Sequence, residues 1–185
     1  MKIYTKTGDA GDTITLSGDR VAKANPLIEA IGSLDEFSTA LGFLASLLSK
    51  EQKDLQEKIA LIQGNLLVMG TMLGISGRPE KANNYPALHN DEVVRLEKDI
   101  DKWQKDLPAL TNFILPGGNQ AGAWAHHARS ICRRMERQIV RAGQNEFVNP
   151  LVIKYSNRLS DWLFVLARKL NAGKELKWSK GKISS

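Results

Sequence analysis

Apolar residues recur at intervals of three and four along most of the chain, and polar residues fill the positions between them. Five stretches carry this pattern, and Pro, Gly or polar residues separate them. The apolar series run from Leu27 to Leu48, Leu55 to Leu73, Val93 to Leu107, Ala121 to Ile139 and Val152 to Leu170. This spacing places the apolar side chains on one helix face, so it predicts five amphipathic helices. Short connections favour an all-α, antiparallel five-helix bundle.

Local signals place several helix ends. Asn25 followed by Pro26 is typical of a helix start, and Asn119 is suited to cap the fourth helix. Ser33 and Glu36 fit a capping box, so we expect Gly32 to divide the first series into a short and a longer helix. Residues 74–89 are rich in Gly, Pro and Asn and are expected to form a loop.

The first 23 residues lack helical periodicity and are rich in Thr, Gly and Asp. We expect an ordered loop here, with a short hairpin near Ile14, Leu16 and Val21. The 185 residues suit one domain. We divide it into a loop (1–24), a helical bundle (25–171) and a basic tail (172–185).

The formal net charge is +6, but it is unevenly spread. After residue 171, four lysines stand against one glutamate, a net of +3. The body is therefore only mildly basic, which favours local anion sites over a continuous nucleic-acid surface. The single cysteine, Cys132, cannot form an intrachain disulfide and is interpreted as a small buried residue. Neither a membrane span nor a secretory signal is recognisable, so we expect a cytoplasmic protein.

The N-terminal loop has the composition of a phosphate site. Gly8 and Gly11 allow backbone N–H groups to converge on an anion. Hydroxyl groups and two lysines would add further donors, from Thr5, Thr7, Thr13, Lys6 and Lys23. The loop has neither the Walker A spacing nor Gly-x-Gly-x-x-Gly. An ordinary Gly/Asp turn between short strands remains the alternative.

The fourth helix carries a cluster of arginines. Arg129, Arg133 and Glu136 share one face, and a neighbouring face carries Arg134, Arg137 and Arg141. The planar guanidinium group suits phosphate or carboxylate. A solvated face with weak internal ion pairs is the alternative.

Two other helices add polar candidates. On the fifth helix, Asn157 could contact the base or sugar of a nucleotide. On the first helix, Asp35 could orient an arginine or help to hold Mg²⁺. Solvent-facing polar residues are the alternative in both cases.

Other site chemistries find little support. The three histidines form no His-x-x-x-His or Glu-x-x-His pair, and no Gly-x-Ser-x-Gly elbow is present. The residues therefore favour anion or nucleotide binding over a bound transition metal or a protein nucleophile.

Several motifs, in order along nearly the whole chain, resemble those of the PduO-type ATP:cob(I)alamin adenosyltransferases. The matching segments are Tyr4-Thr5-Lys6-Thr7-Gly8-Asp9-x-Gly11-x-Thr13, Gly32-x-x-Asp35-Glu36, Phe113-x-Leu115-Pro116-Gly117-Gly118, Arg129-x-x-Cys132-Arg133-Arg134-x-Glu136-Arg137 and Tyr155-x-Asn157-Arg158-Leu159-Ser160-Asp161-x-Leu163-Phe164. Phe37, Ala125 and Met135 depart from the family's usual Leu, Leu and Ala.

The resemblance implies a ferritin-like, cobalamin adenosyltransferase-like bundle that forms a homotrimer with active sites between subunits. It implies transfer of the 5′-deoxyadenosyl group from MgATP to cob(I)alamin, which gives adenosylcobalamin and triphosphate. K⁺ is an additional candidate cation. A reductase and a cobalamin-dependent acceptor enzyme are candidate partners, whereas nucleic acid and membranes are not.

The resemblance also assigns roles to residues. Asp35 pairs with Arg129 of the next subunit, Arg133 acts on ATP, and Phe113 occupies the lower face of the corrin. The implied ATP contacts are Thr5, Lys6, Thr7, Gly8, Asp9, Gly11, Thr13, Ile14, Lys23, Arg133, Arg134, Glu136, Arg137 and Asn157. The alternatives are another ATP-dependent transferase or kinase, a non-catalytic nucleotide sensor with the same fold, or a nucleic-acid binder that uses the arginine helix and the lysine tail.

Overall fold

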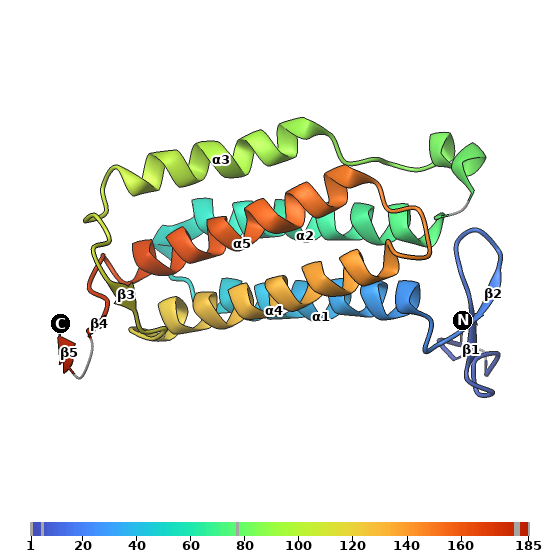
Figure 1. The fold of residues 1–185 in the computed structure, drawn as a ribbon, viewed down its shortest axis with the longest axis horizontal. Helices are drawn as coiled ribbons and strands as arrows, with labels where there is room; N and C mark the ends of the chain where they lie inside the picture. Colours follow the sequence, from blue (N-terminus) through green and yellow to red (C-terminus); the bar gives the residue numbers. More distant parts are fainter. Residues whose placement is uncertain (1, 5, 77, 180–181, 185) are drawn as a thin grey trace.

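The computed structural model describes residues 2–4, 6–76, 78–179 and 182–184, although for residues 79, 81, 82, 179 and 182–184 only the backbone is described. Five long helices lie side by side along one axis (Figure 1). They are α1 (Pro26–Ser46), α2 (Lys53–Gly74), α3 (Asn90–Gln104), α4 (Gln120–Ala142) and α5 (Pro150–Leu170). This arrangement confirms the predicted five-helix bundle. None of the helices in the described part of the chain is long and apolar enough to cross a bilayer.

The helix ends follow the capping signals in the sequence. Asn25, Asn119 and Asn149 cap α1, α4 and α5, because each side chain accepts a hydrogen bond from a backbone N–H in the first turn. The expected break at Gly32 is wrong, since α1 continues through it. The Ser33 hydroxyl instead donates to the Ala30 carbonyl, 2.7 Å away, so Ser33 is an ordinary helix residue and no cap.

The apolar faces meet in one core. Helix α1 packs against α2 and α4, and α5 packs against α3 and α4. Large side chains at the centre, such as Phe37, Met69 and Trp162, are fully enclosed. Cys132 is buried there, as predicted. The core thereby fixes the relative positions of α1, α4 and α5, which carry the candidate site residues outside the N-terminal loop, apart from Phe113.

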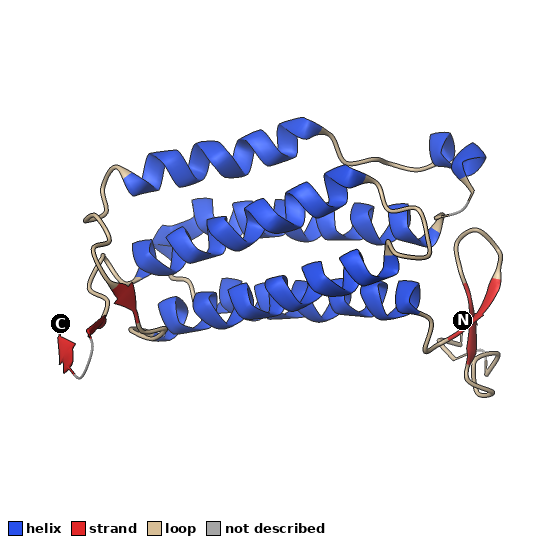
Figure 2. Cartoon of the chain, in the orientation of Figure 1, coloured by secondary structure: helices blue, strands red, loops and turns tan. Residues whose placement is uncertain are grey.

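Among the described residues, strands occur at the two ends of the bundle (Figure 2). At the end where α1 begins, β1 (Asp12–Ile14) and β2 (Arg20–Ala22) form the predicted antiparallel hairpin. At the opposite end, β3 (Phe113–Ile114), β4 (Lys177–Ser179) and β5 (Lys182–Ser184) form an antiparallel sheet in the order β3-β4-β5. The sequence did not predict this second sheet, which places Phe113 opposite Trp178.

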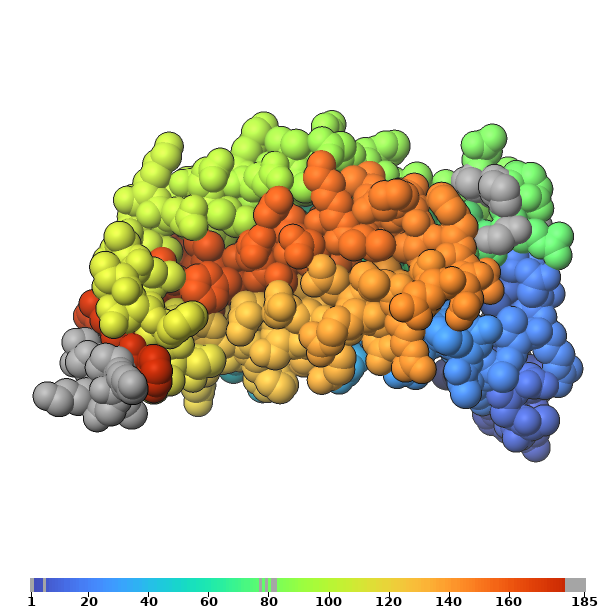
Figure 3. Space-filling model, in the orientation of Figure 1, coloured from blue at the N-terminus to red at the C-terminus, as the bar shows by residue number. Residues whose placement is uncertain are grey.

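Two short 3₁₀ helices complete the structure. η1 (Lys50–Gln52) leads into α2, and η2 (Pro79–Asn84) lies within the segment expected to be a loop. The N-terminal hairpin projects beyond the bundle (Figure 3). Its turn is nevertheless attached to α2, because the N–H of Ser17 donates to the carbonyl of Gly74 over 3.1 Å.

Candidate functional site

A groove of about 610 Å³ runs between the N-terminal hairpin, α1 and α2. Three predicted site residues line it: Thr13 and Ile14 from β1, and Asp35 from α1. Asp35 is exposed, and the described part of the chain gives its carboxylate no ion-pair partner. The groove therefore brings the loop and the first helix together around an unpaired negative charge.

The loop that precedes β1 is held in a tight shape by its own backbone. The N–H of Asp9 donates to the carbonyl of Lys6, and the N–H of Gly11 donates to the carbonyl of Gly8. Lys6 and Gly11 have φ angles of 60° and 88°, a region that glycine adopts without strain. Turns of this kind can direct N–H groups toward an anion. Thr5, another predicted residue, lies outside the described residues.

The ammonium group of Lys23 lies directly over Gly8. A methyl group built on Gly8 would come within 3.1 Å of Lys23 Nζ and 3.2 Å of the Asp12 carbonyl. The backbone N–H of Lys23 also donates to the carbonyl of Gly11 over 2.8 Å. Lys23 is thus joined to the loop, and the space above Gly8 suits a small residue only. The positive charge of Lys23 therefore lies beside the backbone of the loop.

A second pocket, of about 820 Å³, lies at the opposite end of the bundle. Its walls combine residues 110–114 with side chains from α4, α5 and β4, namely Arg129, Phe164 and Trp178. Phe113 is 82% exposed, which is unusual for a phenylalanine within an ordered strand. An open apolar pocket with one cation suits a large, partly apolar and partly charged ligand.

Two side-chain arrangements hold this pocket together. Asn171 accepts a hydrogen bond from the Asn119 N–H (3.0 Å) and donates one to the Gly117 carbonyl (2.8 Å). Arg168 and Glu175 form a buried ion pair at 2.8 Å, with side chains 5% and 4% exposed. The first arrangement fixes the turn after β3, and the second fixes the segment that leads into β4. Together they determine how Phe113 and Trp178 face each other.

The arginine helix divides into paired and unpaired side chains. Arg134 forms an ion pair with Glu36 of α1. Arg133 and Arg137 are exposed, and no ion pair of either is found within the described residues. Exposed, unpaired arginines are available to an external anion, whereas Arg134 would first have to leave Glu36.

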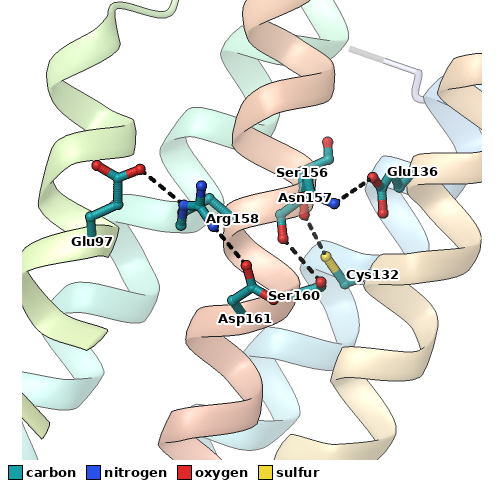
Figure 4. Close-up of polar contacts among 8 residues, drawn as sticks. All are labelled: Glu97, Cys132, Glu136, Ser156, Asn157, Arg158, Ser160 and Asp161. Atoms are coloured by element: carbon teal, nitrogen blue, oxygen red, sulfur yellow. Dashed lines mark hydrogen bonds and ion pairs between the residues drawn. The ribbon is translucent and has the colours of Figure 1, made fainter. Parts of the chain in front are cut away.

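Helices α4 and α5 are also joined by polar side chains (Figure 4). Asn157 Nδ2 donates to Glu136 Oε1 over 3.2 Å, while Arg158 pairs with Glu97 of α3 at 3.0 Å and with Asp161 at 2.8 Å. The predicted pair of Glu136 and Asn157 is therefore adjacent in space. Arg158 and Asp161 are engaged in holding α3 to α5.

Cys132 is unsuited to nucleophilic chemistry. Its thiol donates to the Ser156 carbonyl over 3.5 Å, and burial raises the pKa of the thiol far above its ordinary range. A protonated, enclosed thiol is a poor nucleophile. The site must therefore act without a cysteine nucleophile.

The family model described as cobalamin adenosyltransferase matches residues 3–170, which include both the loop and the arginine helix. The chain belongs to the cobalamin adenosyltransferase family.

Two similar bacterial proteins are covered over most of their length. A cobalamin adenosyltransferase from Cupriavidus metallidurans is 39% identical, over 97% of this chain and 95% of that protein. A corrinoid adenosyltransferase from Bacillus subtilis is 38% identical, over 93% of this chain and 88% of that protein. Among solved structures, a variant PduO-type ATP:corrinoid adenosyltransferase from Lactobacillus reuteri, complexed with cobalamin and ATP, aligns with a TM-score of 0.90. That structure is 33% identical, over 99% of this chain and 98% of its own.

In this cobalamin adenosyltransferase, five predicted site residues lie on α4 and α5, namely Arg133, Arg134, Glu136, Arg137 and Asn157. The others are divided between the two ends of the bundle. The hairpin end holds the N-terminal loop, and the other end holds Phe113 and Arg129 (Figure 1). The sequence did not point to Phe164 or Trp178 as lining residues of the second pocket. An aromatic residue within the lysine-rich tail was the available signal for Trp178.

Proposed function

We propose that this chain transfers the 5′-deoxyadenosyl group from ATP to cob(I)alamin and releases triphosphate. The observation that carries this proposal is the pocket with an exposed Phe113 and a half-buried Arg129, in a chain 33% identical to a PduO-type ATP:corrinoid adenosyltransferase complexed with cobalamin and ATP. A corrin is large and apolar and carries polar groups at its edge. The open volume of about 820 Å³ and its aromatic walls suit such a ligand.

The reaction needs positioning more than protein nucleophiles. The Co(I) electron pair attacks the C5′ carbon of ATP, a Co–C bond forms, and the C5′–O bond breaks. The triphosphate leaves with the electron pair of that bond, so the cobalt becomes formally Co(III). The protein must align the two reactants and stabilise the leaving triphosphate. Exposed cationic side chains such as Lys23 and Arg133 are suited to that task.

The site is completed by a second copy of the chain in this proposal. The nucleotide loop and Phe113 lie at opposite ends of one bundle, so one chain cannot place them around a single substrate pair. A head-to-tail interface brings the loop of one copy to the second pocket of the next and closes into a ring, here a homotrimer. Asp35, unpaired in its own chain, then meets Arg129 of the neighbouring copy.

The ATP contacts follow from this arrangement. The loop residues Lys6, Thr7, Gly8, Asp9 and Gly11 hold the triphosphate together with Lys23. Arg133, Glu136 and Asn157 of the neighbouring copy hold the rest of the nucleotide, and Arg137 lies one turn beyond Arg133. Mg²⁺ enters on the phosphate oxygens of ATP in this proposal, because this ion usually binds through substrate phosphates and few protein carboxylates.

Phe113 contacts the lower face of the corrin in this proposal. An apolar ring there displaces the lower axial base without coordinating cobalt, and four-coordinate cobalt is easier to reduce. Phe113→Ala should therefore impair formation of four-coordinate Co(II) more than ATP binding. An unchanged cobalt spectrum in this variant would remove Phe113 from that role.

One assay tests the function directly. The protein is incubated with MgATP and chemically reduced cobalamin, and the loss of the Co(I) spectrum is followed together with triphosphate release. Both should occur, and triphosphate release should require the reduced corrin. Release of triphosphate or phosphate without corrin would favour another ATP-dependent enzyme, and ATP binding without any turnover would favour a nucleotide sensor.

A further inference from the structure

His126 is a buried imidazole without a hydrogen-bond partner. Its side chain on α4 is enclosed, with 3% of the residue exposed, and neither ring nitrogen has a partner within the described part of the chain. The ring lies edge-on to Phe164, with 6.1 Å between ring centroids, and Phe164 lines the pocket that holds Phe113. His126 is therefore directly behind the wall of that pocket.

Arg129, one turn further along α4, also has a buried nitrogen without a hydrogen-bond partner among the described residues. That nitrogen is Nε, and the side chain lines the same pocket. Buried polar atoms are nearly always hydrogen-bonded, so two such residues at i and i+3 need a common explanation. A neutral imidazole has one acceptor nitrogen, whereas a guanidinium group only donates. The two groups are complementary.

We infer that neutral His126 accepts a hydrogen bond from Arg129 Nε–H, directly or through one water, when the pocket is filled. This bond would fix the guanidinium plane and leave the two Nη groups for the ligand and the neighbouring carboxylate. His126 is then a positioning residue for adenosyl transfer. The inference rests on the proposed function, because that function gives Arg129 its role.

The charges around the ring support a neutral imidazole. Burial lowers the pKa of His126, the charge of Arg129 on the same helix lowers it further, and Glu175, in the segment after α5, acts in the opposite direction. Protonation would remove the acceptor nitrogen and place a second cation beside Arg129. The bond is therefore present at neutral pH and lost as the pH falls through the lowered pKa of His126.

The first test compares stability with turnover. His126→Leu removes two unsatisfied polar atoms, so its urea midpoint should equal or exceed that of the wild type. Its kcat/KM for adenosylation should nevertheless fall by about tenfold or more. His126→Gln, which restores an acceptor, should recover part of the activity and remove the acid limb of the pH profile. The exposed neighbour provides the control, since His127→Gln should behave as the wild type.

Two results would overturn the inference. One is His126→Leu with wild-type kcat/KM. The other is that adding His126→Leu to an Arg129→Met variant lowers kcat/KM as much as His126→Leu does in the wild type. A residue that acts through Arg129 should have little further effect once Arg129 is replaced.

A separate readout does not depend on turnover. The Nε–H of Arg129, assigned by its disappearance in Arg129→Lys, should exchange slowly with water in the ligand-bound wild type and rapidly in His126→Leu. Equal exchange rates would refute the hydrogen bond. If the wild type forms no adenosylcobalamin, the proposed function fails while this comparison still decides the bond.

Discussion

Two helical glycines should respond to alanine in opposite directions. A methyl group built on Gly122, in the first turn of α4, would lie 2.2 Å from Asn171 Oδ1, whereas one on Gly64 in α2 would meet nothing within 4 Å. At Gly64 only helix propensity changes, so Gly64→Ala should stabilise the protein by up to about 1 kcal/mol. At Gly122 alanine brings the same gain in helix propensity, but its methyl group would displace Asn171.

The size of that opposing effect follows from the hydrogen bonds lost. Displaced Asn171 loses its bonds to the Asn119 N–H and the Gly117 carbonyl. Two buried bonds are worth about 1–3 kcal/mol together, and more if the Asn171 amide, 7% exposed, stays unpaired. After subtraction of the propensity gain, Gly122→Ala should destabilise the protein by about 1 kcal/mol, and by more if the Asn171 amide stays unpaired.

Urea unfolding at a fixed protomer concentration measures both changes, since assembly would otherwise shift the midpoint. With a slope of about 2 kcal/mol/M, the midpoint should fall by about 0.5 M or more for Gly122→Ala and rise by up to about 0.5 M for Gly64→Ala. If Gly122→Ala unfolds at or above the wild-type midpoint, Asn171 does not restrain the turn. Gly64→Ala controls for the general effect of adding a methyl group to a helix.

Three further perturbations test other parts of the molecule. Glu175→Gln leaves Arg168 buried without a counter-charge and should lower the free energy of unfolding, measured in urea, by about 3–5 kcal/mol. Replacing both residues by Met should recover much of this loss. Additive effects of the two single changes would contradict the pairing. Because burial raises the pKa of Cys132, its thiol should resist a disulfide reagent at pH 8 in the native protein and react in urea, and fast native reaction would show that the site is open. Arg133→Ala should lower ATP affinity and turnover and leave the free energy of unfolding in urea within about 0.5 kcal/mol of wild type. Wild-type kinetics would remove Arg133 from the site.

The helices were predictable because their signal is periodic and repeated. Series such as Leu27 to Leu48 give many apolar positions on one face, and the Asn caps mark the starts. Gly32 was misleading, since one Ser and one Glu at the right spacing also occur inside a continuous helix. The capping pattern cannot distinguish a helix start from a helix interior when the flanking residues are apolar on both sides.

The second sheet was not predictable from local patterns. β3 has two residues and β4 has three, too few for an alternating pattern, and lysine at β4 suggests solvent. What holds β4 in place is the Arg168–Glu175 pair and the main-chain bond from Leu115 N–H to the Leu176 carbonyl, at 2.8 Å. The main-chain bond joins residues 61 positions apart, and the ion pair crosses the turn after α5, so neither contact follows from an alternating pattern.

The sequence motifs proposed the members of the candidate site but not their arrangement. The motifs named Phe113, Arg129 and the loop, but nothing in their order shows that they lie at opposite ends of the bundle. That separation depends on the direction of each helix, which three-dimensional packing decides. The partners of Arg134 and Asn157 likewise come from neighbouring helices.

The distance between the loop and Phe113 has a genetic consequence. A chain damaged in the loop keeps an intact pocket at its far end, and a chain damaged at Phe113 keeps an intact loop. If neighbouring copies share sites, the two defective alleles should complement each other when expressed together. Some sites then combine an intact loop from one copy with an intact Phe113 pocket from its neighbour. Two alleles damaged at the same end should never do so.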